Sequence, residues 1–144
     1  MKLEELENID EIYENEEIAN VLSEVIFAPS YGKLKSISEG IYRKKHAKFY
    51  ILKRDIQVIA VVGVMFRDIK NIEIKHIAVA KDENKNVVKA QLIDLLKEKL
   101  NVSSFRIEIE RESIGFYKKN GFKCEAMDDK GYGIQSFLCI KNYK

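Results

Sequence analysis

The sequence has few of the residues that mark linkers, disulfide frameworks and metal sites. It contains one proline, Pro29, which argues against any long linker. Its two cysteines, Cys124 and Cys139, occur without CxxC spacing or a nearby histidine. The sequence therefore suggests neither a zinc site nor a disulfide framework, and we expect two buried or half-buried thiols in strands.

The N-terminus lacks a long apolar run. Residues 1–5 are acidic and amphipathic, whereas a signal peptide or a membrane span needs a continuous apolar segment. We therefore expect a cytoplasmic protein with no membrane partner. The adjacent acids Asp128 and Asp129 are more typical of a solvated turn than of a metal site, so we expect no metal.

A strong net charge is also absent, because the 144 residues sum to +2, which by itself selects no polyanionic partner. The charges are nevertheless unevenly placed: residues 1–24 carry nine acids against one lysine, and residues 33–54 carry six lysines and two arginines against one glutamate. Solvated helix faces are the main interpretation. Nucleic-acid binding through residues 33–54 is a distant alternative, because no helix-turn-helix, zinc finger or base-stacking motif accompanies the charge.

Length and composition indicate a globular chain. Hydrophobic residues make up 46% and charged residues 33% of the sequence, which is typical of a packed core under a well-solvated surface. The length is enough for one real core and too short for two. We expect a single domain over residues 1–144.

The stretch from residues 72 to 100 changes its hydrophobic period halfway. In its first eight residues alternate side chains fall on opposite faces, with Glu73 on one and His76 on the other, as in a strand. From Val88 onward apolar residues recur every three or four positions, as in a helix. The polar loop between them, residues 80–87, precedes the helix's free N–H groups and positive dipole end. The stretch therefore predicts an anion site.

The remaining periodicity predicts further helices and strands. The expected helices are Leu3–Phe27 with a break near Asn15, Leu34–Arg43 and Ile114–Asn120, and the expected strands are Phe49–Lys53, Val58–Phe66, Ser104–Glu110, Phe122–Ala126 and Ile134–Ile140. A short first strand within residues 1–6 stays open as an alternative. Ser113 is expected to cap the last helix, and Gly121 to follow it in a left-handed conformation. The order predicts an α/β fold with a mixed, mostly antiparallel sheet flanked by helices. The nearly unbroken apolar run at residues 58–66 predicts a central strand that is covered on both faces.

Two segments, in this order, resemble the GNAT superfamily of acyl-CoA-dependent N-acetyltransferases. They are residues 74–79 (IKHIAV), followed by a loop and a helix, and residues 115–122 (GFYKKNGF) on a short helix. The resemblance covers about residues 49–137. It implies direct transfer of an acetyl group from acetyl-CoA, the co-substrate, to a primary amine of a small molecule or peptide.

The resemblance also assigns residues to the two ligands. It implies that the main chain at the strand's end holds the pantetheine arm, that the loop and first helical turn hold the pyrophosphate, and that two central strands part to admit the thioester. The residues assigned to acetyl-CoA are Ile77, Ala78, Val79, Asn84, Lys85, Asn86, Val87, Val88 and Lys89. The amine would enter from the other side near the first two helices, where family position assigns Phe27, Pro29, Tyr31, Tyr132 and Gln135, with plain packing as the alternative.

Two side chains are candidates for proton handling. Tyr117 matches the family tyrosine that protonates the departing thiolate, with packing beside Phe116 as an equally weighted alternative. Glu73 matches a strand position from which some members use a carboxylate as a base on the incoming ammonium, and a solvated strand face is its alternative. His76 is expected to be a core or pocket-lining histidine.

The phosphate loop departs from the family pattern. That pattern reads Q/R-x-x-G-x-G/A, and residues 84–89 here read NKNVVK, so both glycines are missing. Glycine there allows a close backbone approach to the pyrophosphate, while Lys85 and Lys89 add positive charge. Glu110 also stands where many relatives have an asparagine that contacts the cofactor.

These departures leave an alternative to an enzyme, which is a degenerate GNAT-fold CoA-binding sensor or protein-interaction module without turnover. An exposed edge strand near the C-terminus could pair in a homodimer.

Overall fold

A seven-stranded sheet forms the centre of the protein, and the computed structural model describes residues 1–127 and 135–143 of it. The strand order is β1-β2-β3-β4-β5-β7-β6, and every neighbouring pair is antiparallel except β4 and β5. This confirms the predicted α/β fold with a mostly antiparallel sheet. The strands are β1 Lys2–Glu5, β2 Ala47–Arg54, β3 Gln57–Phe66, β4 Asn71–Val79, β5 Ser104–Glu110, β6 Lys123–Ala126 and β7 Ser136–Asn142.

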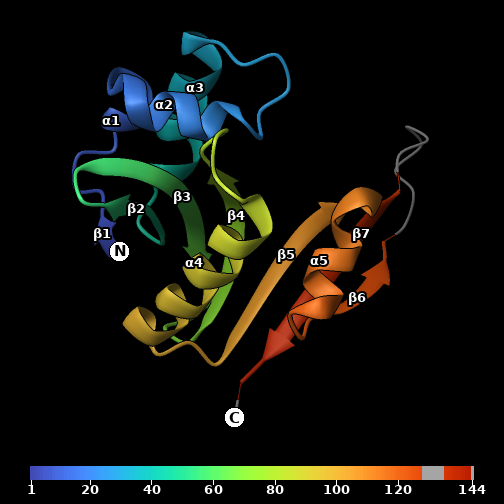
Figure 1. Cartoon of the computed structure of the whole chain (residues 1–144). Coiled ribbons are helices and arrows are strands. Elements are labelled where there is room, and N and C mark those ends of the chain that lie inside the picture. Colours follow the sequence, from blue (N-terminus) through green and yellow to red (C-terminus); the bar gives the residue numbers. More distant parts are fainter. Residues whose placement is uncertain (128–134, 144) are drawn as a thin grey trace.

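The helices cover both faces of the sheet, as Figure 1 shows. They are α1 Glu11–Glu14, α2 Glu16–Ser23, α3 Tyr31–Ile37, the π-helix η1 Ser38–Tyr42, α4 Lys85–Leu100, the 3-10 turn η2 Arg111–Ser113 and α5 Ile114–Lys119. The open alternative at the N-terminus is resolved in favour of a strand, β1. Asn15 breaks the first helical segment as predicted, because its side chain accepts a hydrogen bond from the N–H of Ile18 and starts α2. Ser113 makes no capping hydrogen bond, so that prediction was wrong, whereas Gly121 has the predicted left-handed φ of 89°.

Two cores lie on opposite sides of β3, which confirms its prediction as a doubly covered strand. One core joins the sheet to α4 and α5 and includes Val62, Leu92 and Tyr117. The other joins the sheet to α1, α2, α3 and η1 and includes Val61 and Leu22. The side chains of β3 are buried from Val58 through Val64. Because β4 lies beside β3 in the same sheet, each of its side chains also faces one of these two helical layers.

A β-bulge in β4 changes the faces that simple alternation predicts. Gly63 of β3 pairs with His76 while Val64 pairs with Ile74, so Lys75 is an extra residue without a β3 partner. Ile74 packs with the α4 core, and His76 contacts Tyr42, a member of the other core. The sequence prediction that Glu73 and His76 face opposite sides was wrong, because the bulge inverts the alternation between them.

The two cysteines form a disulfide, which corrects the prediction of two free thiols. Cys124 and Cys139 are directly opposite each other in the antiparallel pair of β6 and β7, and their sulfurs are bonded. Opposed cross-strand residues bring their Cβ atoms within bonding reach of a disulfide. The spacing of 15 residues carries no motif, which explains why the sequence did not reveal the bond.

Ion pairs connect the acidic N-terminal region to the basic segment at residues 33–54. Arg43 lies 2.5 Å from Asp10, Lys48 lies 3.3 Å from Glu5, and Lys53 lies 3.4 Å from Glu4. The uneven charge in the sequence thus serves partly to pair strands and helices that are distant along the chain. This pairing leaves fewer cations of residues 33–54 for nucleic acid. Within the described residues, no helix has the length and apolar character needed to cross a membrane.

Candidate functional site

The candidate site begins where β4 and β5 separate. The parallel ladder runs from Asn71 paired with Ser104 to Ile74 paired with Ile107, and the last five residues of β4 have no β5 partner. Figure 1 shows the two strands diverging beyond this point. The predicted cofactor residues Ile77, Ala78 and Val79 lie in this unpaired stretch, with their side chains buried in the two cores. Their main-chain groups on the β5 side are therefore free of the ladder.

The N-terminus of α4 follows directly after β4. Asn84 caps the helix, and its side-chain oxygen accepts a hydrogen bond from the N–H of Val87 at 3.3 Å. As in any first helical turn, the N–H groups of Lys85 and Asn86 have no intrahelical acceptor. Val88 is 3% exposed and donates its N–H to the carbonyl of Asn84, which gives it a packing role, and its assigned cofactor contact stays a prediction.

A clamp holds the loop between β4 and α4. The Arg54 guanidinium donates two hydrogen bonds to the Glu83 carboxylate, at 3.0 and 2.9 Å. This bidentate geometry lowers the pKa of Glu83 and keeps the pair charged. Arg54 comes from the end of β2, so the loop that precedes α4 is tied to an element two strands away.

Lys89 occupies the position of the second missing glycine. Its ammonium lies 4.6 Å from the ring centre of Phe116 and 5.4 Å from that of Tyr117, both on α5. Burial lowers the pKa of Lys89, and the charge of Lys85 adds to this effect. The electron-rich faces of the two rings attract this half-buried cation.

A cavity of about 360 Å³ lies between α4 and α5, and Phe116, whose ring Lys89 contacts, lines it. It brings together the predicted cofactor residues Asn86 and Val87 with residues of the second family-like segment. Its lining residues are Asn86, Val87, Ala90, Gly115, Phe116, Lys119 and Asn120. The helix that follows the first family-like segment and the second segment itself therefore meet around one space.

Tyr117 lies on the α5 side of the same region. It is 1% exposed, and its ring makes edge-on contacts with Phe116 and Phe122 at centroid distances of 5.0 and 5.2 Å. Burial raises the pKa of the Tyr117 hydroxyl, so it remains protonated at physiological pH. The residue can therefore donate a proton or a hydrogen bond, and it also packs.

Glu73 lies on the face of β4 that carries α1, α2 and α3. Its neighbours Ile72 and Ile74 both face the α4 core, so the carboxylate between them is on the opposite face. It pairs with the ammonium of Lys75 at 3.6 Å and is 23% exposed. Because the bulge brings His76 to this face too, Glu73 and His76 lie on the same side of the strand.

A hydrogen bond that sequence reasoning missed joins His76, which is half-buried, to the buried Tyr42. The Tyr42 hydroxyl and His76 Nδ1 are 2.5 Å apart, and Tyr42 is 3% exposed. Burial lowers the pKa of His76 to about 4, with the charge of Lys75 contributing. The two residues are 34 apart in the sequence, and neither has a motif around it. His76 is half-buried, and its core or pocket-lining role stays a prediction.

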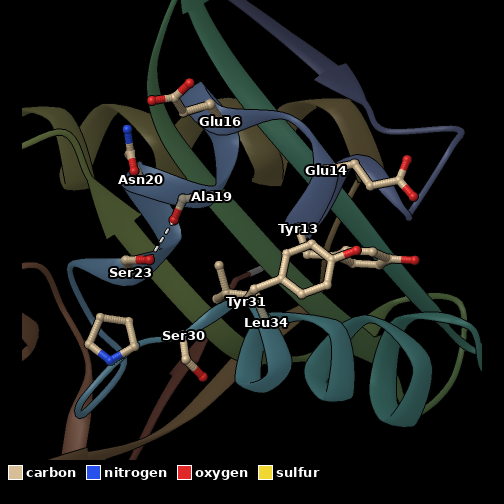
Figure 2. A pocket seen from close by; sticks show the side chains of 10 residues that line it. Tyr13, Glu14, Glu16, Ala19, Asn20, Ser23, Ser30, Tyr31 and Leu34 are labelled. Carbon is tan, nitrogen blue, oxygen red and sulfur yellow. Dashed lines mark hydrogen bonds between the residues drawn. The ribbon is translucent and has the colours of Figure 1, made fainter.

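A groove of about 650 Å³ lies between α2 and α3 on that same helical layer. Figure 2 shows the rings of Tyr13 and Tyr31 between the two helices, where they meet edge-on at 5.3 Å, with Glu14 and Glu16 at the rim. Of the residues predicted for the acceptor side, Pro29 and Tyr31 line this groove. Phe27 is 91% exposed, Gln135 donates hydrogen bonds to the carbonyls of Met127 and Ser136, and Tyr132 lies outside the described residues.

Comparison with known proteins identifies the fold. No protein-family model matches the sequence, and no curated protein matches it in sequence. The aminoglycoside 6'-N-acetyltransferase of Enterococcus faecium is similar in structure with a TM-score of 0.72 and 11% identity, covering 99% of this chain and 97% of that chain. The ribosomal-protein-S18-alanine N-acetyltransferase of Escherichia coli has a TM-score of 0.73 and 15% identity, covering 98% and 92%.

A third similar structure contains the expected co-substrate. A GNAT family acetyltransferase of Elizabethkingia anophelis, with acetyl-CoA bound, has a TM-score of 0.66 and 17% identity, covering 99% of this chain and 97% of that chain. At these identities the likeness shows the fold. The chain has the fold of GNAT acetyltransferases, as the resemblance implied.

Proposed function

We propose that the protein is an N-acetyltransferase that moves an acetyl group from acetyl-CoA directly to a primary amine of a small molecule or peptide. The observation that carries this proposal is the separation of β4 from β5 after Ile74, next to the N-terminus of α4. An unpaired strand edge offers main-chain groups to an extended pantetheine arm, and the helix N-terminus favours a pyrophosphate. Two of the similar structures hold coenzyme A or acetyl-CoA, which supports the same ligand here.

The proposed reaction needs no covalent enzyme intermediate. The amine nitrogen forms a bond to the thioester carbon, and the carbonyl π electrons move onto oxygen. The C–S bond then breaks, its electron pair leaves with sulfur, and the thiolate takes a proton from the Tyr117 hydroxyl. Before the attack the bound ammonium gives one proton to Glu73, the proposed acceptor, and after the attack the nitrogen gives a second proton to solvent. The carbonyl re-forms as the C–S bond breaks, solvent reprotonates Tyr117, and the products are an acetamide and free coenzyme A.

Lys89 is proposed to compensate for the missing glycines in holding the pyrophosphate. The Lys89 ammonium lies over the rings of Phe116 and Tyr117, and Phe116 lines the same cavity as Asn86 and Val87. A charge-assisted hydrogen bond to a phosphate contributes about 1.5–3 kcal/mol. A side-chain cation thus takes over part of the binding that close backbone approach gives in the glycine-bearing pattern.

Lys89→Met is expected to weaken acetyl-CoA binding about 10-fold to 100-fold, because it removes this cation and keeps the apolar stem. Isothermal titration calorimetry measures the affinity. The matched control is Lys99→Met at the exposed opposite end of α4, which should leave the affinity unchanged. Tighter binding by a Val87→Gly/Lys89→Gly double variant would show instead that the side chains obstruct the pyrophosphate.

Glu73→Gln is expected to leave acetyl-CoA affinity nearly intact and to depress the acetylation rate at neutral and low pH. The carboxylate would remove a proton from the bound ammonium, and raising the pH should recover part of the lost rate because the free amine fraction then grows. A pH–rate profile of both proteins with polyamines, amino acids, aminoglycosides and peptides measures this. Profiles of equal height would remove Glu73 from the mechanism.

The second candidate function is a CoA-binding sensor or interaction module without turnover, favoured by the loss of both loop glycines. It shares acetyl-CoA binding with the first and differs in lacking acetylated product. Binding of acetyl-CoA without acetylated product across the amine panel would favour the sensor. If millimolar acetyl-CoA produces no heat of binding and no thermal shift, both functions are excluded. A homodimer through the edge strand β6 and the single domain over residues 1–144 stay predictions.

A further inference from the structure

The hydrogen bond between Tyr42 and His76 is held by several independent features. Tyr42 ends the π-helix η1, an element that is rare and frequent at functional sites. Its ring packs edge-on against Phe49 at 5.1 Å, and Ser38 at the start of η1 donates to the carbonyl of Ile9 at 2.9 Å. The phenol therefore has a fixed position from which its hydroxyl reaches His76 Nδ1.

The backbone of β3 leaves space for this hydroxyl. Gly63 is the β3 residue opposite His76, and a Cβ added to it would lie 1.8 Å from the Tyr42 oxygen. No real side chain tolerates such a distance. The Tyr42 hydroxyl thus lies over Gly63, on the β3 side of the imidazole.

The hydrogen-bonding pattern fixes the tautomer of His76. Burial keeps both groups neutral, since it raises the pKa of Tyr42 and lowers the pKa of His76. A neutral imidazole has one N–H and one acceptor nitrogen. Within the described residues the Tyr42 hydroxyl has no other partner, so a proton on Nδ1 would leave the hydroxyl proton buried without an acceptor. Tyr42 therefore donates to Nδ1, and Nε2 carries the imidazole proton.

The hydrogen bond with Tyr42 leaves Nε2–H for another partner. The two ring nitrogens point in widely different directions, and Nδ1 points toward the hydroxyl over β3. Nε2–H therefore points away from the Tyr42 hydroxyl. His76 lies two residues beyond Ile74, the last β4 residue paired with β5. The charged groups beside it on β4 are Lys75 and Glu73, which pair with each other.

We propose that His76 is a catalytic residue whose neutral Nε2–H donates a hydrogen bond to the thioester carbonyl oxygen, and that Tyr42 is the positioning residue that holds this tautomer. The inference rests on the proposed acetyl transfer and adds a donor to it. As the amine adds to the carbonyl carbon, the π electrons move onto the oxygen, which the Nε2–H stabilises while keeping its proton. A neutral imidazole performs this task without changing its protonation state.

Infrared difference spectroscopy of bound [1-13C]acetyl-CoA tests the hydrogen bond without requiring turnover. We expect the carbonyl stretch to lie at lower frequency in the wild-type protein than in His76→Phe, with Tyr42→Phe between them. The matched control is Tyr50→Phe, because the Tyr50 hydroxyl is also buried and has no partner among the described residues. Equal frequencies in wild type and His76→Phe would overturn the inference and leave the proposed function standing, whereas absent binding by the wild type would overturn both.

Nitrogen-15 NMR of the histidines supplies a second readout in the free protein. We expect His76 to be protonated on Nε2 and to stay neutral down to about pH 4. Tyr42→Phe should produce a mixture of tautomers, and Tyr50→Phe should not. In turnover with an accepted amine, His76→Phe should lower kcat about 10²-fold, as loss of one oxyanion donor does. A proton found on Nδ1 in the wild type, or an unchanged kcat in a folded His76→Phe, would contradict the proposal.

Discussion

Tyr117→Phe is expected to lower kcat for acetyl transfer by about 10²-fold to 10⁴-fold, the range of a general acid, while acetyl-CoA affinity changes little. The hydroxyl would act on the leaving thiolate, which carries its charge only as the C–S bond breaks, so its loss is felt in the transition state. Since burial raises the pKa of Tyr117, the wild-type rate should not fall through loss of this proton below pH 10. Steady-state kinetics over pH, with calorimetry for acetyl-CoA, measure both parts.

The phenylalanine keeps the ring contacts that Tyr117 makes with Phe116 and Phe122, so the variant should fold. The matched control is Tyr143→Phe, whose lost hydroxyl is buried without a hydrogen-bond partner among the described residues. That control should leave kcat unchanged. If Tyr117→Phe and Tyr143→Phe have equal kcat values, Tyr117 has a packing role only.

Gly63→Ala is expected to lower the free energy of unfolding by about 1–3 kcal/mol, the cost of overpacking a core. The added Cβ would lie 1.8 Å from the Tyr42 oxygen and 2.2 Å from the adjacent ring carbon, so the whole ring must move. Because Tyr42 is 3% exposed and packed by Phe49, the displacement disturbs the core of the α1–α3 layer. Urea unfolding followed by circular dichroism measures the loss.

The matched control is Gly40→Ala on η1, where an added Cβ meets nothing within 4 Å. It should leave stability unchanged or raise it by up to about 1 kcal/mol, because alanine has the higher helix propensity. In the Tyr42→Leu background Gly63→Ala should cost much less, because no ring then occupies the space, and the double-mutant cycle should show strong coupling. Equal losses for Gly63→Ala in both backgrounds would mean that the clash does not govern this position.

The parts of the fold that the sequence predicts well are those with long periodic patterns. The α4 helix, the doubly covered β3 and the alternating β5 follow from their apolar periods, as confirmed by burial in the structure. The start of α4 is less well predicted, at Val88 rather than Lys85, because the residues of its first turn are largely exposed and carry no apolar period. The capping side chain of Asn84 is the local signal that could have located it.

The candidate site also has a part that the sequence predicts and a part that it does not. The α4 terminus and Tyr117 lie in continuous segments, so their neighbourhood could be predicted from order along the chain. The group of Tyr42, Gly63 and His76 assembles across η1, β3 and β4, and nothing local marks it. The same holds for the Cys124–Cys139 disulfide and for the ion pairs between residues 1–24 and 33–54, because each depends on which helices and strands become neighbours in space.

The bulge at Lys75 has a consequence for how such chains are aligned and engineered. Deletion of Lys75 would leave β4 a regular strand. If the part after Lys75 keeps its register with β3, every β4 side chain before it turns to the other helical layer, and if the part before it keeps its register, every side chain after it does. In a sequence alignment, a gap placed one position away from Lys75 would align Glu73 or His76 with residues that face the other helical layer.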